Sequence, residues 1–290
     1  NQVWFITAGG AVFAAWPLVY ATAFSGFYWA MMATLWALFF RPVGFDYRSK
    51  IKHPAWRSTW DWGLFIGGAM PPVIFGVAFG NLLLGVPFHF NDYLMSTYPG
   101  SFWGLLNPFA LLAGVVSLGM ITTQGANYLM MRTEGDIYRR VRTASLIFAA
   151  LTVASFALAG YWVATGIDGY MIVSAIDPNA LPDPLAKTVE VAPGAWMHNY
   201  AVYAWAKWVP IAAFAALAAS ILFSRLHKAG AAFWSSSLAC AGIIGTAGVS
   251  LFPFIMPSSS DPHSNLTIYN TISSHLTLGL MLGATVIFMP

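Results

Sequence analysis

The fold is decided by a run of 24 uncharged residues at positions 63–86, which reads GLFIGGAMPPVIFGVAFGNLLLGV. About 20 apolar residues in a helix cross the ~30 Å hydrocarbon layer of a membrane. A helix also satisfies its own backbone hydrogen bonds where no water is present. The run therefore predicts one membrane-spanning helix.

The composition of the whole chain extends this prediction to the rest of the sequence. Only 8% of the 290 residues are charged and 58% are hydrophobic, whereas soluble proteins carry about 25% charged residues. So much apolar surface exceeds what one soluble core can hide. A single cysteine also excludes a disulfide scaffold. We expect an all-α integral membrane protein.

Further uncharged runs indicate several spans. They cover residues 21–40, 63–86, 103–128, 144–165, 202–223, 231–254 and 271–289, with Lys207 as the one charge near an end. A shorter stretch, 3–19, joins the first of these almost without a break. One helix over residues 3–39 would be ~55 Å long and too long for the membrane. We therefore expect a tight hairpin near residues 20–22, and about eight spans in all.

The distribution of charge predicts the orientation of these spans. Eleven of the 13 Lys and Arg residues fall in three loops, at 41–57, 132–142 and 225–228. Six of the 10 acidic residues, Asp177 among them, fall in the alternating segments. By the positive-inside rule the basic loops face the cytoplasm. The same loops could also contact anionic lipid.

A long polar segment divides the chain. Residues 166–200 contain four prolines and scattered acids, which indicates a solvated loop. We expect one helical group over residues 1–165, a periplasmic loop over 166–200, and a second, truncated group over 201–290.

Histidine and cysteine patterns were considered for metal and haem binding. The six histidines show no ligand spacing and most lie in expected loops or at helix edges: His53, His89, His198, His227, His263 and His275. A lone histidine near a span end, as at position 275, is typical of an interfacial residue. We expect no metal ligation by this chain alone.

The segment at 39–50, FFRPVGFDYRSK, carries the first candidate site. Pro42 follows Arg41 directly, so we expect the helix to end or kink with a guanidinium at the membrane boundary. Asp46 could turn back to pair with Arg41 or with Arg48. Two interpretations stay open, namely a snorkelling arginine and a charged element near a proton entry route.

A second candidate is the acid in Trp60-Asp61-Trp62. Asp61 is either a helix N-terminal residue favoured by the helix dipole or a member of an ionic network with the preceding basic loop. Amides and hydroxyls deeper in the spans can join helices or carry water. Glycine pairs such as Gly67-Gly68 indicate close helix packing, since the lysine and strand of a phosphate loop are absent.

The string RPVGFDYRSK at 41–50 closely resembles the region after an early span in subunit II of the cytochrome bd-type ubiquinol oxidases. The resemblance continues through NQVWFITAGG (1–10), FSGFY (24–28), WDWG (60–63), GVAFGNLL (76–83), LAGVVS (112–117), GIDGY (166–170) and FPFIMPSS (252–259). These motifs follow the family order over nearly the whole chain.

The resemblance implies a subunit of a terminal respiratory complex that oxidises quinol and reduces dioxygen to water. It implies two four-helix bundles plus a peripheral helix in the full subunit, and haems of b and d type bound by the partner, subunit I. Such a subunit supports assembly, can hold a structural quinone, and contributes to a cytoplasmic proton path. A small accessory subunit and membrane lipid are further partners of this kind of complex, and nothing indicates nucleic acid.

Carried over to this sequence, the resemblance makes Arg41 the first candidate for the proton path, with Asp46, Arg48 and Asp61 as supporting candidates. It implies no catalytic residue within this chain itself. It also leads us to expect a fragment that lacks the first helix and the C-terminal end of the full subunit. The rival interpretations are a permease and a purely structural membrane scaffold.

Overall fold

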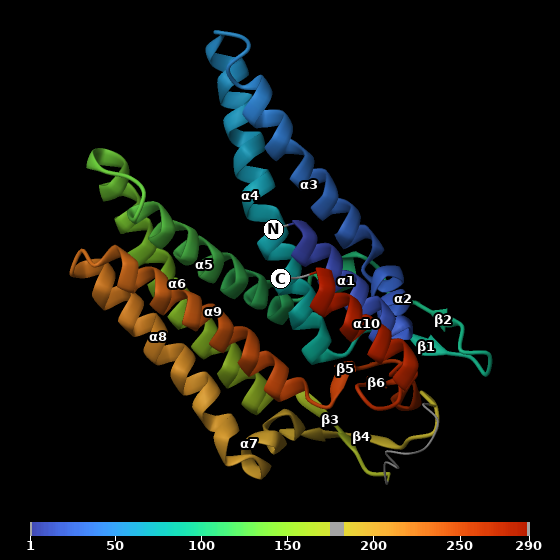
Figure 1. Cartoon of the computed structure of the whole chain (residues 1–290). Coiled ribbons are helices and arrows are strands. Elements are labelled where there is room, and N and C mark those ends of the chain that lie inside the picture. Colours follow the sequence, from blue (N-terminus) through green and yellow to red (C-terminus); the bar gives the residue numbers. More distant parts are fainter. Residues whose placement is uncertain (1, 175–182, 289–290) are drawn as a thin grey trace.

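A computed structural model of the chain describes residues 2–174 and 183–288, so Asp177 and part of the predicted outer loop lie outside the described residues. The protein is a bundle of helices with three short two-stranded sheets gathered at one end (Figure 1).

Within the described residues, five helices are long and apolar enough to cross a membrane, and they form the body of the molecule. They are α4 (Pro54–Leu84), α5 (Pro108–Met130), α6 (Gly135–Gly166), α8 (Trp208–Arg225) extended by η3 (Ala204–Lys207), and α9 (Ala229–Leu251). A sixth span results if α2 (Pro17–Gly26) and α3 (Tyr28–Tyr47), which meet at a bend of 76°, are taken together.

The expected eight spans are therefore too many. Helices α1 (Gln2–Ala15) and α10 (His275–Phe288), with 14 described residues each, lie at the two ends of the given sequence and are not among these spans. The expected hairpin near residues 20–22 is also wrong, because these residues lie inside α2. The chain breaks instead at Trp16 and at Phe27. Pro17 explains the first break, since a residue before proline avoids the α conformation.

Helices α5, α6, α8 and α9 pack side by side, as Figure 1 shows, and α4 joins them along α5. Buried alanines, Ala213, Ala216 and Ala239, pack with the larger Leu217 in the core of this group. Contacts thus cross the predicted boundary between residues 165 and 201. The division into two helical groups stays a prediction for the full subunit.

The strands form a compact cap at one end, which we call the strand end. It consists of β1 (His89–Phe90) with β2 (Ser96–Thr97), β3 (Asp168–Ile172) with β4 (Val189–Pro193), and β5 (Phe254–Met256) with β6 (Leu266–Thr267). Short helices complete it: η1 (Trp103–Leu105), η2 (Ala195–Met197), α7 (His198–Val202) and η4 (Pro262–Ser264).

Backbone pairing across the strand end joins the two halves of the chain. The Val86 amide donates to the Pro257 carbonyl at 2.9 Å, and the Ser259 amide donates to the Val86 carbonyl at 3.0 Å. The Ser258 hydroxyl donates to the Phe88 carbonyl. Trp196, 1% exposed, donates from its indole to the Leu83 carbonyl at 3.0 Å. The motif at 252–259 is thus hydrogen-bonded to the segment at 86–88 that follows α4.

Candidate functional site

The α3–α4 hairpin carries all four candidate residues, and glycines set the distance between its helices. A Cβ atom built on Gly67 would lie 2.6 Å from the Ala37 carbonyl oxygen, and one on Gly44 would lie 2.9 Å from Leu64. Such distances leave no room for a side chain, so the helices approach as closely as backbones allow. The predicted role of Gly67 in packing is confirmed, whereas Gly68 faces open space.

Arg48 and Asp61 form a two-pronged ion pair across the turn of this hairpin. The Arg48 Nε donates to Asp61 Oδ1 at 2.5 Å and its Nη2 donates to Oδ2 at 3.1 Å. The pair joins Asp61 to one cation of the preceding basic loop, and a wider ionic network stays a prediction. The hydrogen bond and charge of Asp61 raise the pKa of Arg48 above its ordinary value, so Arg48 remains a fixed cation.

Aromatic rings hold the turn in place around the ion pair. The Trp56 indole donates to the Tyr47 carbonyl at 2.8 Å, which ties the start of α4 to the end of α3. The ring of Trp60 lies 5.8 Å from that of Trp56 and 6.2 Å from that of Tyr47. The buried Trp60 indole nitrogen has no hydrogen-bond partner in the part of the chain that the structure describes.

Arg41 lies on the same hairpin but is not part of the ion pair. The helix does not end at Arg41, as its neighbour Pro42 suggested, but continues to Tyr47. The packing of Gly44 against α4 outweighs the local effect of the proline. The stem of Arg41 covers Gly67, with its Cγ 2.8 Å from the Cβ position there. Among residues 2–174 and 183–288 its exposed guanidinium has no ion-pair partner.

The expected pairing of Asp46 with Arg41 or Arg48 is wrong. Arg48 is engaged with Asp61 instead, and Asp46 is exposed within the last turn of α3, with no ion pair to any described residue. Because α3 continues through Gly44, the chain cannot fold back there to bring Asp46 to either arginine. The candidates thus divide into a neutralised pair, Arg48–Asp61, and two side chains left open to solvent or a partner, Arg41 and Asp46.

A second polar cluster lies inside the bundle, where sequence reasoning found only part of it. The fully buried Asn127 donates to Ser220 at 2.9 Å and to the Ala232 carbonyl at 3.2 Å, and accepts from Ser145 at 2.6 Å. The amide thus joins α5 to α6, α8 and α9. The serines of this cluster could not be identified from the sequence. A serine hydroxyl in a helix can donate to a backbone carbonyl of the same helix, so its presence in an apolar run does not indicate a contact between helices. The geometry is that of a structural clamp.

The histidines of the described residues lie apart from one another. The six lie on separate elements, and two of them already use a ring nitrogen: His227 bonds Tyr138 at 3.1 Å and His263 bonds the Lys187 carbonyl at 3.0 Å. Within residues 2–174 and 183–288 no three His, Cys, Asp or Glu side chains gather as metal ligands. The absence of haem ligation by this chain stays a prediction.

Comparisons with known proteins agree with this arrangement. The family model described as cytochrome bd terminal oxidase subunit II matches residues 1–290. Subunit 2 of cytochrome bd-I ubiquinol oxidase from Escherichia coli K12 is 54% identical over all of this chain and 76% of its own length. Over the same shares, a probable cytochrome oxidase subunit 2 from Haemophilus influenzae is 53% identical, and cytochrome bd ubiquinol oxidase subunit 2 from Bacillus subtilis is 30% identical.

The fold is also similar to a solved structure. A chain in the structure of bd oxidase from Geobacillus thermodenitrificans superposes with a TM-score of 0.59 at 14% identity, over 90% of this chain and 68% of that one. At this identity the likeness concerns the fold alone. Together with the match of the family model to every residue, these findings show that the chain belongs to the family of subunit II of cytochrome bd terminal oxidases.

Proposed function

We propose that this chain binds no haem itself, supports assembly with the haem-bearing subunit I, and contributes Arg41 to a proton path from the cytoplasm. The chain is a multi-pass inner-membrane subunit of a respiratory quinol oxidase, and the permease alternative is not favoured. The observation that carries the proposal concerns the two arginines of the α3–α4 hairpin. Arg48 is paired with Asp61, whereas the exposed Arg41 has no ion-pair partner among the described residues.

The orientation in this proposal is supported by the placement of the turns. The α3–α4, α5–α6 and α8–α9 turns, which hold the three basic loops, lie away from the strand end (Figure 1). We call this side the basic end. The positive-inside rule assigns the basic end to the cytoplasm, from which the protons for dioxygen reduction would come.

The roles of the four residues follow from their contacts. Arg48 and Asp61 fix the turn of the hairpin and keep its local charge balanced. Arg41 is the cation at the edge of the apolar span, where it can hold a partner carboxylate ionised and order water. Asp46, one and a half turns further along α3, can receive protons from solvent.

The test is an Arg41→Ala variant in the intact oxidase complex. We expect oxygen consumption with quinol to fall about tenfold or more, since general acid–base and proton-positioning groups contribute at least that much, with haem content unchanged. Arg57→Ala is the matched control, because Arg57 is an exposed cation in the same basic loop. Normal turnover with normal haem would exclude the role in proton transfer, and loss of haem would indicate an assembly role instead.

A structural quinone in this subunit is supported by an aromatic hollow at the strand end. The hollow has a volume of about 530 Å³, and its lining includes Trp29, Tyr98, Trp103 and two serines. The buried hydroxyl of Tyr98 has no partner in the described chain, and burial raises its pKa, so it remains a donor. A quinone carbonyl is a suitable acceptor for it.

The quinone content of purified complexes tests this assignment. Tyr98→Phe removes the donor and should lower the quinone retained per complex severalfold. Tyr93→Phe is the control, because Tyr93 is 85% exposed on the same connection. If both variants retain as much quinone per complex as the parent complex, the hollow beside Tyr98 is not the quinone site.

A further inference from the structure

The seam between α5 and α9 at the basic end combines one open cation with a row of aromatic rings. The Arg132 guanidinium carbon lies 5.7 Å from the ring centre of Tyr128. Tyr128 lies 6.0 Å from Phe233, and Phe233 lies 5.9 Å from Trp234, which is 73% exposed. The row continues from the turn after α5 across to the start of α9.

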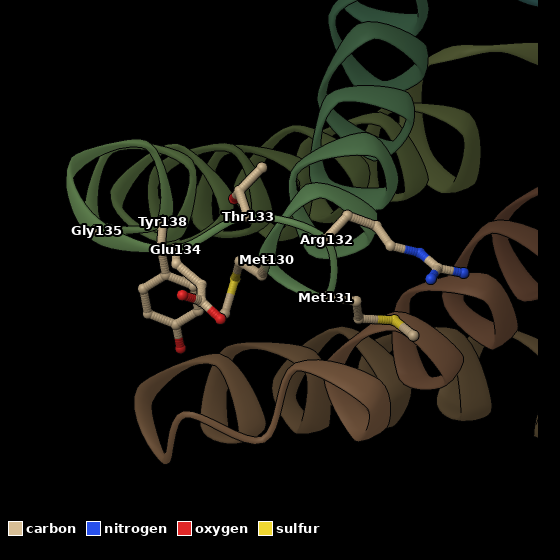
Figure 2. Close-up of a pocket in the computed structure, with 7 residues that line it drawn as sticks. All are labelled: Met130, Met131, Arg132, Thr133, Glu134, Gly135 and Tyr138. Carbon is tan, nitrogen blue, oxygen red and sulfur yellow. The ribbon is translucent and has the colours of Figure 1, made fainter.

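Nearby carboxylates do not neutralise Arg132. Figure 2 shows its guanidinium directed away from Glu134 and Tyr138, which lie at the other side of a hollow of about 550 Å³. Asp136 is paired with Arg139. Within the described ranges Arg132 has no ion pair, and neither does Lys228 on the adjacent turn. Both cations of the seam are therefore free to bind an anion directly.

The surface below this charge is apolar and unfilled. Gly125, near the C-terminal end of α5, is exposed, and a Cβ built there would meet nothing within 4 Å. The same holds for Gly230 at the start of α9. The two helices are held together at this level by Gln124, which donates to Ser237 at 2.7 Å and accepts from Ser236. These hydrogen bonds tie α5 to α9 beneath the seam.

We propose that this seam binds one anionic phospholipid. The phosphate binds Arg132, whose planar fork suits a phosphate and whose position is fixed by the Tyr128 ring. Lys228 adds a second charge. One acyl chain follows Tyr128 and the open strip at Gly125, while Trp234 lies at headgroup level, as interfacial tryptophans do. A free phosphate would lack the acyl contacts and would not be retained.

The proposal can be tested on the intact oxidase complex in nanodiscs of phosphatidylcholine with added phosphatidylglycerol. Native mass spectrometry then measures how many phosphatidylglycerol molecules each complex retains and how tightly. Arg132→Gln should weaken the tightest phosphatidylglycerol about fivefold to tenfold, the change expected for one cation at a lipid surface. Tyr128→Leu, which keeps the charge, should weaken it less. Glycerol phosphate in millimolar excess should not displace it.

Arg140→Gln is the matched control, because Arg140 is an exposed cation of the same basic loop, within the second turn of α6, with no cation–π contact among the described residues. It should leave the tightest phosphatidylglycerol in place. Equal weakening in both variants would overturn the proposal, since it would mean diffuse attraction to a basic surface. Unchanged retention in Arg132→Gln, or displacement by glycerol phosphate, would overturn it as well.

Discussion

Lys187 is a buried cation at the strand end. Its ammonium group donates to the Pro184 carbonyl at 2.5 Å and to the His263 carbonyl at 3.1 Å, and the residue is 8% exposed. Burial lowers its pKa from 10.5 to about 8, against the opposing effects of Asp183 and Asp261. The lysine therefore fastens the β3–β4 hairpin to the segment around η4.

This shift predicts a pH dependence of stability. Between pH 8 and 10.5 the unfolded state holds a proton that the folded state has released, so stability rises with pH in this window, by at most about 3 kcal/mol. Below pH 8 both states are protonated and the cost of burying the charge is constant. Lys187→Met should remove the rise.

The measurement is the midpoint of thermal inactivation of the complex between pH 7.5 and 9.5. Lys207→Met is the control, because Lys207 is exposed at the same end of the molecule. A rise that persists in Lys187→Met, or disappears in Lys207→Met, would contradict the assignment.

At the scale of elements, the α3–α4 hairpin is set by backbone contact at Gly67. A methyl group there would collide with the Ala37 carbonyl, whereas the adjacent Gly68 has open space. We expect Gly67→Ala to destabilise the hairpin by about 1–3 kcal/mol through overpacking. Gly68→Ala should be neutral or slightly stabilising, because alanine favours the helix.

Heat stability of the assembled complex, followed by haem absorbance, distinguishes the two variants. Equal behaviour of Gly67→Ala and Gly68→Ala would show that the helices separate enough to admit a methyl group. The stem of Arg41 covers Gly67. Loss of turnover in Gly67→Ala without loss of stability would therefore connect the contact between α3 and α4 to the proposed proton path.

The elements also show where sequence reasoning succeeds and where it fails. Length and hydropathy placed the long helices, because an uncharged run of over 20 residues has few other solutions. The same measure placed the first break of the chain wrongly, since it does not register the break between Trp16 and Pro17. At Pro42 the sequence predicted that the helix ends or kinks, and it does not end there, because packing against α4 carries α3 on to Tyr47.

The candidate site shows the same division. The charge pattern indicated that Arg48 and Asp61 belong to one region, but only the geometry of the turn decides which acid meets which base. Asp46 is two residues from Arg48 in sequence, yet Asp61, thirteen residues away, is its partner. Proximity in sequence is a poor guide where a helical hairpin intervenes.

At the scale of the whole molecule, the charged turns and the strands lie at opposite ends (Figure 1). The proposed orientation therefore predicts opposite labelling of two single-cysteine variants. Lys228→Cys at the basic end should react with a membrane-impermeant maleimide only in inside-out vesicles, and Tyr93→Cys at the strand end only in right-side-out cells. The native Cys240 is partly buried within α9, and its replacement by alanine provides the background.

Labelling of Lys228→Cys from outside the cell would reverse the orientation and remove the cytoplasmic proton route with it. Labelling of both variants from the same side would contradict the separation of the two ends.

The interlock between the Val86 region and the motif at 252–259 has a consequence for biogenesis. The hydrogen bond from Ser258 to Phe88 closes a loop of 170 residues, so it cannot form until almost all of this chain has left the ribosome. Local helical hairpins such as α3–α4 form far earlier, because their contacts are close in sequence. Membrane insertion thus precedes the sealing of the strand end, and an interrupted synthesis would leave the apolar face of Phe88 exposed to the quality-control proteases of the cell envelope.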